Sequence, residues 1–156
     1  MIYDVIIIGS GPAGLAAGVY AQRARLSSII IEKEYMSGGQ ILNTYEVDNY
    51  PGLPGINGFD LGMKLREHCE GLGAEFVTAE VEKVSLAEDG QTKLVQTAEE
   101  TYQAKTVILA MGARHRLLEV PGEEEFTGMG VSYCATCDGA FFKDRVTAVV
   151  GGGDVA

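Results

Sequence analysis

The sequence has little positive charge, and its basic side chains are scattered. Lys and Arg number 12 against 22 Asp and Glu, which gives a formal net charge of −10 over 156 residues. The densest basic cluster is the short run Arg114-His115-Arg116. Because nucleic-acid phosphates are bound by a clustered basic face, we expect no nucleic-acid partner.

Long apolar runs are missing as well. No stretch approaches the roughly 18 apolar residues that a membrane helix requires, so we expect no membrane association. The N-terminus, Met1-Ile2-Tyr3-Asp4, lacks the basic region and the cleavage site of a signal peptide. The 46% hydrophobic content is typical of a globular chain. These features predict a globular protein, and the N-terminus together with the low number of cysteines, three in all, indicates the cytoplasm.

Glycine, in contrast, makes up 21 of the 156 residues, roughly twice its usual frequency. The first glycine cluster follows residues 4–8, a short β-branched run typical of a strand buried on both faces. A helical stretch over 15–25 and a second strand over 28–31 come next, and Glu32 ends that strand. The cluster itself consists of Gly9, Ser10, Gly11, Pro12, Ala13 and Gly14.

This order of strand, glycine turn, helix and strand predicts a dinucleotide site. Gly9 permits the tight turn, Gly11 lets the backbone approach a pyrophosphate, and Gly14 lets the helix pack closely on the strand. The helix N-terminus offers free N–H groups and a positive dipole end to that pyrophosphate. Glu32 is placed to accept hydrogen bonds from a ribose. The alternative is an ordinary glycine turn with Glu32 facing solvent, and the complete motif favours the nucleotide site.

The middle of the chain is less explicit. Residues 38–58 are polar and rich in turns, which is typical either of a segment lying along a ligand or of a surface connection. Residues 58–72 have the spacing of an amphipathic helix. His68 and Cys69 lie beside its apolar stripe, and we expect both to serve packing.

A small antiparallel meander is predicted for residues 75–104, where apolar and polar positions alternate around a turn at Asp89-Gly90. Another buried strand, 107–110, follows. Parallel strands joined by helices, with the meander as a crossover, describe an incomplete, Rossmann-like, three-layer domain of the α/β class. The sequence changes character near Pro121-Gly122. We therefore expect a first domain over 1–113, a linker over 114–122 and a second domain over 123–156.

Cysteine is scarce, and only two of the three cysteines are close in sequence. Cys134 and Cys137 have the spacing of half a zinc site or of a redox dithiol. A zinc site needs two more ligands, and neither Cys69 nor the two histidines form a second paired element, so we expect no metal. A redox pair fits better, and a helix starting near residue 136 would favour the reactive thiolate. Asp138 is then a proton donor or acceptor, or a cap of that helix.

The last residues repeat the first motif. A buried strand is predicted over 146–150, and a second glycine fingerprint follows it, with Gly151, Gly153 and Ala156 at the small-residue positions and Asp154 between them. The helix that should face a pyrophosphate is not reached. We expect residues 123–156 to be the truncated start of a second, NAD(P)-binding Rossmann-like domain.

Five segments together resemble one known family. They are residues 9–14, Gly38-Gly39-Gln40, Asn49-Tyr50-Pro51-Gly52, Pro121-Gly122-Glu123 and residues 130–139. This set resembles the bacterial low-molecular-weight thioredoxin reductases from residue 2 to the last residue. The C-A-T-C-D-G segment is its most specific element. One departure is Met111, where the family often has Thr. The resemblance implies the N-terminal half of a longer enzyme.

The resemblance also implies a mechanism and a homodimer. NADPH would reduce FAD, the flavin would reduce a Cys134–Cys137 disulfide, and the dithiol would reduce thioredoxin. Cys137 would lie on the flavin side, Cys134 would attack thioredoxin, and Asp138 would be the general acid. The family's NADPH domain rotates against its FAD domain, and Pro121-Gly122 falls where such a hinge would lie. The FAD-binding domain would use residues 9–14, Glu32, Gly39, Gln40, Asn49, Val81, Ala110, Met111 and Gly112, and the NADPH site would use Gly151, Gly153, Asp154 and Ala156.

Two other functions stay open at this point. One is a related FAD-dependent dithiol oxidase that passes electrons to oxygen, and the other is a non-catalytic, truncated nucleotide-binding module. A flavin absorbance spectrum separates the module from the two enzymes. Oxygen consumption measured against thioredoxin-dependent turnover separates the enzymes from each other. We also expect residues 1–156 alone to lack NADPH-dependent turnover, because half of the second nucleotide site is missing.

Overall fold

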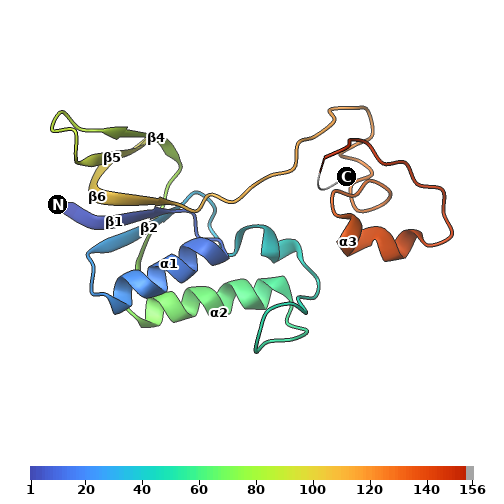
Figure 1. Ribbon diagram of the computed structural model, residues 1–156, viewed down its shortest axis with the longest axis horizontal. Coiled ribbons are helices and arrows are strands. Elements are labelled where there is room, and N and C mark those ends of the chain that lie inside the picture. Colours follow the sequence, from blue (N-terminus) through green and yellow to red (C-terminus); the bar gives the residue numbers. More distant parts are fainter. Residues whose placement is uncertain (154–156) are drawn as a thin grey trace. The chain divides into compact units, whose positions relative to one another are not determined.

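A computed structural model describes residues 1–153, without the side chains of residues 136, 137 and 140. The chain divides into two compact units, Met1–Gly112 and Ala113–Ala156, and each is described here by itself. The first unit contains a six-stranded sheet and two long helices. Figure 1 shows both units, with most of their helices and strands labelled.

The sheet of the first unit has the strand order β3-β2-β1-β6-β5-β4. Its central strand β1 owes its place to the apolar run at Val5–Ile8, whose side chains are all buried. β1 pairs in parallel with β2 on one side, Ile6 opposite Ile29, and with β6 on the other, Ile6 opposite Val107. The strands are β1 Ile2–Ile8, β2 Ser28–Glu32, β3 Glu75–Thr78, β4 Val81–Leu86, β5 Lys93–Thr97 and β6 Thr101–Leu109.

Two helices cover one face of the parallel strands. Helix α1, Pro12–Arg23, starts with proline at its first position, where a missing N–H costs nothing, and Arg25 with φ of 57° follows its end. Helix α2, Gly58–Gly71, is capped by Asn57, whose side chain accepts a hydrogen bond from the amide of Asp60 at 2.8 Å. The helices pack on the side chains that point to one face of the strands. That core cluster consists of Val5, Ile7, Leu15, Ala21, Ile30 and Cys69.

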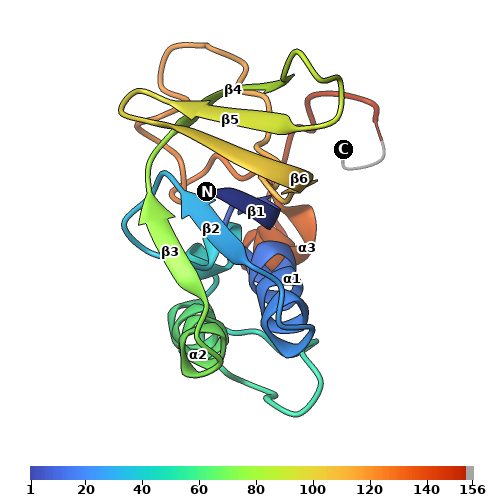
Figure 2. The ribbon, with the colours of Figure 1, turned by 90° about the vertical axis from the view of Figure 1, so that its left-hand side faces the viewer.

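The opposite face of the parallel strands is covered by the β4–β5 hairpin, which gives the unit three layers (Figure 2). This second core cluster consists of Ile6, Ile8, Ile29, Ile31, Val95 and Ala104. Strands β1 and β2 contribute to both clusters because successive side chains alternate between faces. The predicted three-layer, Rossmann-like architecture with a meander is confirmed for this unit.

Two boundaries of the meander were predicted wrongly. Residues 75–78 do not belong to it: β3 pairs in parallel with β2, Ile30 opposite Phe76. The meander is β4-β5-β6, and β6 is one strand through residue 109, so 107–110 is not a separate strand. β6 pairs with β5 over residues 101–104 and with β1 from Gln103 to Leu109, so the two pairings overlap at Gln103 and Ala104. The turn at Asp89-Gly90 is confirmed, since Asp89 accepts hydrogen bonds from the amides of Gln91 and Thr92 at 2.8 Å each.

The second unit has only short elements among its described residues. These are the one-turn helix α3, Ala135–Asp138, and a 3-10 turn, Gly139–Phe142. The predicted strand over 146–150 is wrong: the segment forms no strand, and Val146, Val149 and Val150 are exposed. A strand needs a neighbouring strand to satisfy its backbone groups. Within residues 113–153 the only pairing is an isolated bridge between Thr127 and Val131.

Candidate functional site

The glycine-rich turn lies between β1 and α1, at the carboxyl ends of the parallel strands. Gly9 has φ of 102°, and its amide donates to the carbonyl oxygen of Ile31 at 2.8 Å. A Cβ on Gly9 would collide with the carbonyl oxygen of Ala110, and a Cβ on Gly14 would collide with that of Gly9. Both positions therefore require glycine because backbone passes directly over them.

Gly11 differs from these two because a Cβ there would meet no atom within 4 Å. It stands at the start of α1, whose first turn has neither a side-chain cap nor an acidic residue. The N–H groups of a helix start are unpaired unless a side chain, water or ligand accepts from them, and the helix dipole favours an anion there. The open space and the uncapped helix fit a pyrophosphate group.

A second glycine turn lies against the first. The amide of Gly38 donates to the carbonyl oxygen of Ser10 at 2.9 Å. A Cβ on Gly39 would lie 3.6 Å from the Cα of Gly11, so these two glycines are neighbours in space. Gln40 follows in the 3-10 turn Gly39–Asn43 and is exposed. The start of the turn-rich segment 38–58 therefore lies beside the glycine fingerprint, residues 9–14, at the carboxyl ends of the parallel strands. We call this edge of the first unit the loop edge.

Glu32 ends β2 beside the first glycine turn. Its Oε2 accepts hydrogen bonds from the amide of Ser10 at 2.7 Å and from the hydroxyl of Ser10 at 2.9 Å. Its Oε1 accepts from the amide of Glu34 at 3.1 Å. Burial raises the pKa of Glu32, but these hydrogen bonds outweigh it and hold the pKa below its usual value. The group is an ionised acceptor at the edge where a ribose would lie.

The end of β6 completes this edge. The amide of Ala110 donates to the carbonyl oxygen of Ile8 at 2.8 Å, which carries the pairing one residue past the strand. Met111 is exposed, and Gly112 has φ of 70° with open space at its Cβ position. The carboxyl ends of β1, β2 and β6 thus meet at one edge, where ligands of open α/β sheets bind.

Two predicted cofactor residues lie elsewhere in the first unit. Asn49 is exposed on the loop closed by the bridge between Val47 and Ile56. Val81 starts β4 and packs against the core cluster on the hairpin side of the sheet. Both remain predictions from the resemblance.

Arg66 and Ser37 support the second glycine turn and were missed in the sequence. Arg66, on α2, donates from Nη1 to the hydroxyl of the buried Ser37 at 3.0 Å, and its guanidinium lies 3.7 Å from the ring centroid of Phe76. Ser37 directly precedes Gly38. The spacing of Arg66 and Glu70, which are 2.7 Å apart, is a visible helical pair, but nothing in the sequence connects Arg66 to Ser37.

The cysteines have different states. Cys134 is in a disulfide, whereas Cys69 is a free, fully buried thiol that donates to the carbonyl oxygen of Leu15 at 3.0 Å. Burial raises the pKa of Cys69. The packing role predicted for Cys69 is confirmed, and that for His68 is wrong, because α2 turns this ring to solvent. The side chain of Cys137 lies outside the described part of the chain.

Asp138 contacts the start of residues 132–138, which we call the Cys134 segment. Its Oδ2 accepts a hydrogen bond from the hydroxyl of Ser132 at 2.6 Å, and the same hydroxyl accepts from the amide of Cys134 at 3.1 Å. The amide of Asp138 donates to the carbonyl oxygen of Cys134 at 3.0 Å. Helix α3 starts at Ala135, close to the predicted start, but a four-residue helix has only a small dipole to offer a thiolate.

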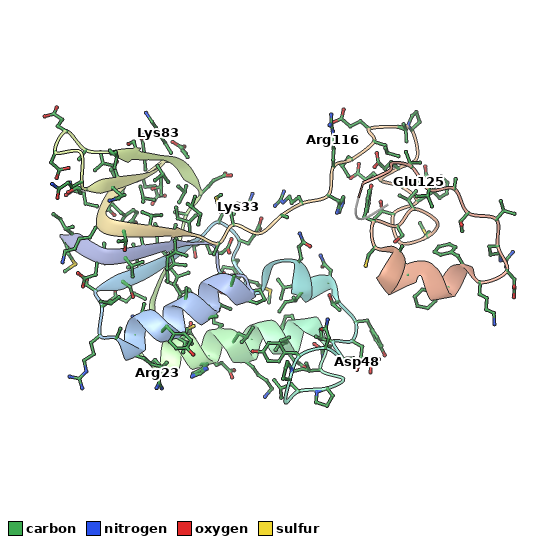
Figure 3. The ribbon with its side chains drawn as sticks, viewed as in Figure 1. Arg23, Lys33, Asp48, Lys83, Arg116 and Glu125 are labelled. Carbon is green, nitrogen blue, oxygen red and sulfur yellow. The ribbon has the colours of Figure 1, made fainter. Side chains whose placement is uncertain are left out.

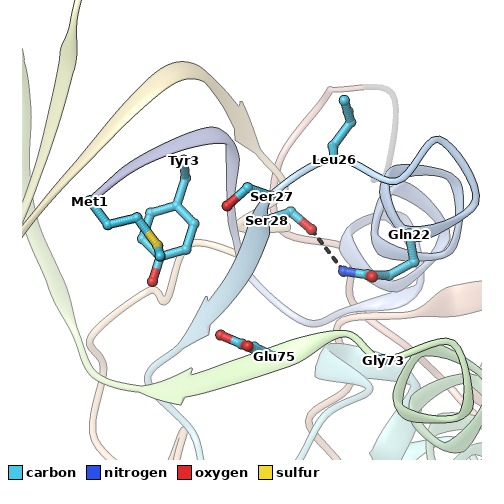
Figure 4. Close-up of a pocket in the computed structure, with 8 residues that line it drawn as sticks. All are labelled: Met1, Tyr3, Gln22, Leu26, Ser27, Ser28, Gly73 and Glu75. Carbon is cyan, nitrogen blue, oxygen red and sulfur yellow. Dashed lines mark hydrogen bonds between the residues drawn. The ribbon is translucent and has the colours of Figure 1, made fainter.

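A hollow of about 320 Å³ lies at the opposite end of the parallel strands from the glycine turns. It is bordered by Met1 and Glu75, and by Gln22, which donates to the hydroxyl of Ser28 at 3.0 Å (Figure 4). None of the predicted site residues borders it. It therefore does not belong to the candidate nucleotide site.

The described residues supply neither a metal cluster nor a membrane helix. Among residues 1–153 with described side chains, no group of three or more His, Cys, Asp and Glu could hold a metal ion. Over the same residues, every helix is too short or too polar to cross a bilayer. In the first unit the basic side chains stand well apart: Arg23 ends α1, Lys33 follows the end of β2 and Lys83 lies in β4 (Figure 3).

A family model and curated relatives match nearly the whole of this chain. The family model described as "Pyridine nucleotide-disulphide oxidoreductase" matches residues 3–156. The chain is 50% identical over 156 residues to the thioredoxin reductase of Bacillus subtilis and 51% identical to that of Listeria innocua, covering 99% of this chain and 48% of each relative. It thus spans about half the length of these curated relatives.

Solved structures agree with the sequence relatives. The thioredoxin reductase from Streptococcus pyogenes matches with a TM-score of 0.79 and 50% identity, over 92% of this chain and 46% of that one. The enzyme from Lactococcus lactis matches with a TM-score of 0.75 and 47% identity, over 90% and 45%. With its glycine turns at the sheet edge and Cys134 in a disulfide, the chain belongs to the pyridine nucleotide-disulphide oxidoreductase family.

Proposed function

We propose that the protein carrying this chain is a thioredoxin reductase, which transfers electrons from NADPH through FAD and a Cys134–Cys137 disulfide to the disulfide of thioredoxin. The observation that carries the proposal is the disulfide at Cys134, inside a C-A-T-C-D-G segment. Relatives named thioredoxin reductase, about 50% identical over nearly the whole chain, support it.

The first unit is the proposed FAD-binding part. The uncapped start of α1 and the open space at Gly11 would take the pyrophosphate, and Glu32 would accept from a ribose hydroxyl. Gly39 and the residues from Ala110 to Gly112 would border the same cofactor from the other loops of this edge, with Gln40, Asn49 and Val81 as further contacts. When bound, FAD would supply the hydride and electron transfer that side chains cannot perform.

The second unit is the proposed site of thiol–disulfide exchange. With the pair reduced, the Cys134 thiolate would attack one sulfur of the thioredoxin disulfide, forming a mixed disulfide and releasing one thioredoxin thiolate. The Cys137 thiolate would then attack Cys134, which re-forms the internal disulfide and releases the second thioredoxin sulfur. Asp138 would hand over the proton that a departing thiolate needs.

Three further parts of the proposal follow the resemblance. Residues 114–122 would be the linker between the FAD-binding and NADPH-binding domains. Gly151, Gly153, Asp154 and Ala156 would belong to the NADPH fingerprint, and the last two lie outside the described residues. The protein would act as a homodimer in the cytoplasm.

The test uses the protein at its full natural length. We expect a flavin absorbance spectrum and NADPH oxidation that depends on thioredoxin, and we expect Cys134→Ser and Cys137→Ser to abolish thioredoxin reduction while the flavin stays bound. A protein without flavin would support a non-catalytic module. Oxygen consumption that is unaffected by thioredoxin would support a dithiol oxidase.

A further inference from the structure

The carboxylate of Glu123 is buried, with only 6% of the residue exposed, although most of the second unit's described residues are exposed. Its Oε1 accepts a hydrogen bond from the amide of Leu118 at 2.8 Å. Its Oε2 accepts from the amide of Glu119 at 2.6 Å and, less closely, from that of Val120 at 3.4 Å. Three successive amides that converge on one carboxylate form an anion-binding concavity, and here the chain fills it with its own side chain.

The backbone around this concavity depends on the carboxylate. Glu119 has φ of 59°, a left-handed conformation that a residue with a Cβ seldom adopts without a compensating contact. The short hydrogen bond from its own amide to Glu123 supplies that contact. The carbonyl oxygen of Glu123 also accepts from the hydroxyl of Thr127 at 2.8 Å, so the residue is held on both sides.

The same carboxylate reaches the residue before the disulfide. The hydroxyl of Tyr133 donates to Oε1 of Glu123 at 2.7 Å, and Tyr133 directly precedes Cys134. The Tyr133 ring stacks on His115, with ring centroids 3.7 Å apart and planes 13° from parallel. One carboxylate therefore joins the backbone of residues 118–120 to the side chain that enters the Cys134 segment.

We propose that Glu123 is a positioning residue for Cys134. It holds Tyr133 against the 118–120 turn and thereby fixes the backbone from which the Cys134 sulfur projects. The inference rests on the proposed function in that it takes Cys134 and Cys137 to cycle together between a disulfide and a dithiol. A fixed backbone before Cys134 keeps the Cys134 sulfur close to the Cys137 sulfur, and it therefore favours the disulfide over the dithiol.

The test compares three variants of the full-length protein with bound flavin. Glu123→Gln removes the charge from the concavity, Tyr133→Phe removes only the hydroxyl, and Glu124→Gln removes the same charge from the exposed neighbouring side chain as a matched control. The first readout is hydrogen exchange at the amides of 118–120. The second is the equilibrium of the cysteine pair with dithiothreitol, which involves no thioredoxin. Circular dichroism and flavin absorbance check folding.

We expect Glu123→Gln to accelerate exchange at Leu118 and Glu119 about tenfold or more, because a hydrogen bond to a charged acceptor is lost. We expect it to shift the cysteine pair toward the dithiol about tenfold, equivalent to about 30 mV for two electrons. Tyr133→Phe should also shift the cysteine pair toward the dithiol, with less effect on amide hydrogen exchange. If Glu123→Gln does not fold, the thiol–disulfide equilibrium of Tyr133→Phe tests the inference. Glu124→Gln should change neither.

Two outcomes would overturn the inference. One is a Glu123→Gln protein that matches Glu124→Gln in both readouts. The other is faster amide exchange with an unchanged thiol–disulfide equilibrium in both Glu123→Gln and Tyr133→Phe, which would leave Glu123 with a purely local role in the turn. A lack of thioredoxin turnover in the unsubstituted protein would instead count against the proposed function, because neither readout uses thioredoxin.

Discussion

Gly38 and Ser10 join two glycine-rich turns that lie far apart in the sequence. The amide of Gly38 donates to the carbonyl oxygen of Ser10 at 2.9 Å, and this contact brings Gly39 beside Gly11. The loop edge of the first unit is therefore a single surface, built from the end of β1, the start of α1 and the turn that precedes the 3-10 segment. Within the glycine fingerprint, Gly11 borders open space and Gly14 packs against backbone, so substitutions at the two positions should have different effects.

Gly11→Ala and Gly14→Ala should have opposite consequences. Gly11 has φ of −69° and open space at its Cβ position, so alanine should lower the free energy of unfolding only by the penalty of alanine against glycine at a helix N-cap, about 0.5–1 kcal/mol. Its methyl group would instead occupy the space proposed for the pyrophosphate, and flavin affinity should fall. Gly14→Ala forces a methyl group against the Gly9 carbonyl and should cost about 1–3 kcal/mol of stability. Denaturant titration and flavin titration measure the two effects, and a Gly11→Ala protein that binds flavin normally would contradict the assignment.

Glu32→Gln should lower stability in a pH-dependent way. Hydrogen bonds from Ser10 and Glu34 hold the pKa of Glu32 below its usual value in the folded state. The stabilisation is therefore fully present above the unfolded-state pKa and is lost as the pH falls through the lower folded-state pKa. At pH 7 we expect a loss of about 1 kcal/mol in Glu32→Gln, discounted for solvent screening. Urea titrations across the acid range measure it, and a difference from wild type that grows toward acid pH would contradict this account.

Arg66→Met should weaken flavin binding without touching the loop edge itself. The substitution removes the hydrogen bond to Ser37 and the cation–π contact with Phe76, so the turn at Gly38-Gly39 loses its support. Lys64→Met is the matched control, because Lys64 lies on the same helix, is exposed and loses the same charge. Flavin titration should show weaker affinity in Arg66→Met alone. Equal affinities in the two variants would show that the Ser37 contact does not position the turn.

Cys69 should resist alkylation in the folded protein. Burial raises the pKa of its thiol, and the sulfur is enclosed between α1 and α2, so little thiolate is available. After mild reduction, iodoacetamide followed by mass spectrometry should find Cys134 and Cys137 modified and Cys69 intact. Rapid modification of Cys69 under native conditions would show that the two helices separate readily.

The sequence was most informative where one local pattern determines the structure. The β-branched run 5–8, the glycine spacing and the Asp89-Gly90 turn each predicted the element that forms, because buried strands, close backbone approaches and tight turns select those residue types. It failed for β3, since a strand of four residues does not reveal whether its neighbour is β2 or β4. It also failed at 146–150, where an apolar run has no neighbouring strand among the described residues.

The candidate site likewise has parts that the sequence predicted and parts that it did not. The fingerprint and the cysteine pair were visible in the sequence because each is a short motif. The Arg66–Ser37 contact and the Glu123–Tyr133 contact were not, because they join residues on separate elements or turns through side chains whose directions only the folded chain shows. Glu123 belongs to a segment that carries the family resemblance, but its spacing alone does not show that it accepts from three amides.

The measurement that tests the central claim most directly is the reduction potential of the Cys134/Cys137 pair in the full-length protein. Thioredoxin has a potential of about −270 mV, so a pair that reduces it should lie at or below about −270 mV. A potential near −200 mV would make the transfer uphill by roughly 3 kcal/mol and would contradict the proposed reduction of thioredoxin.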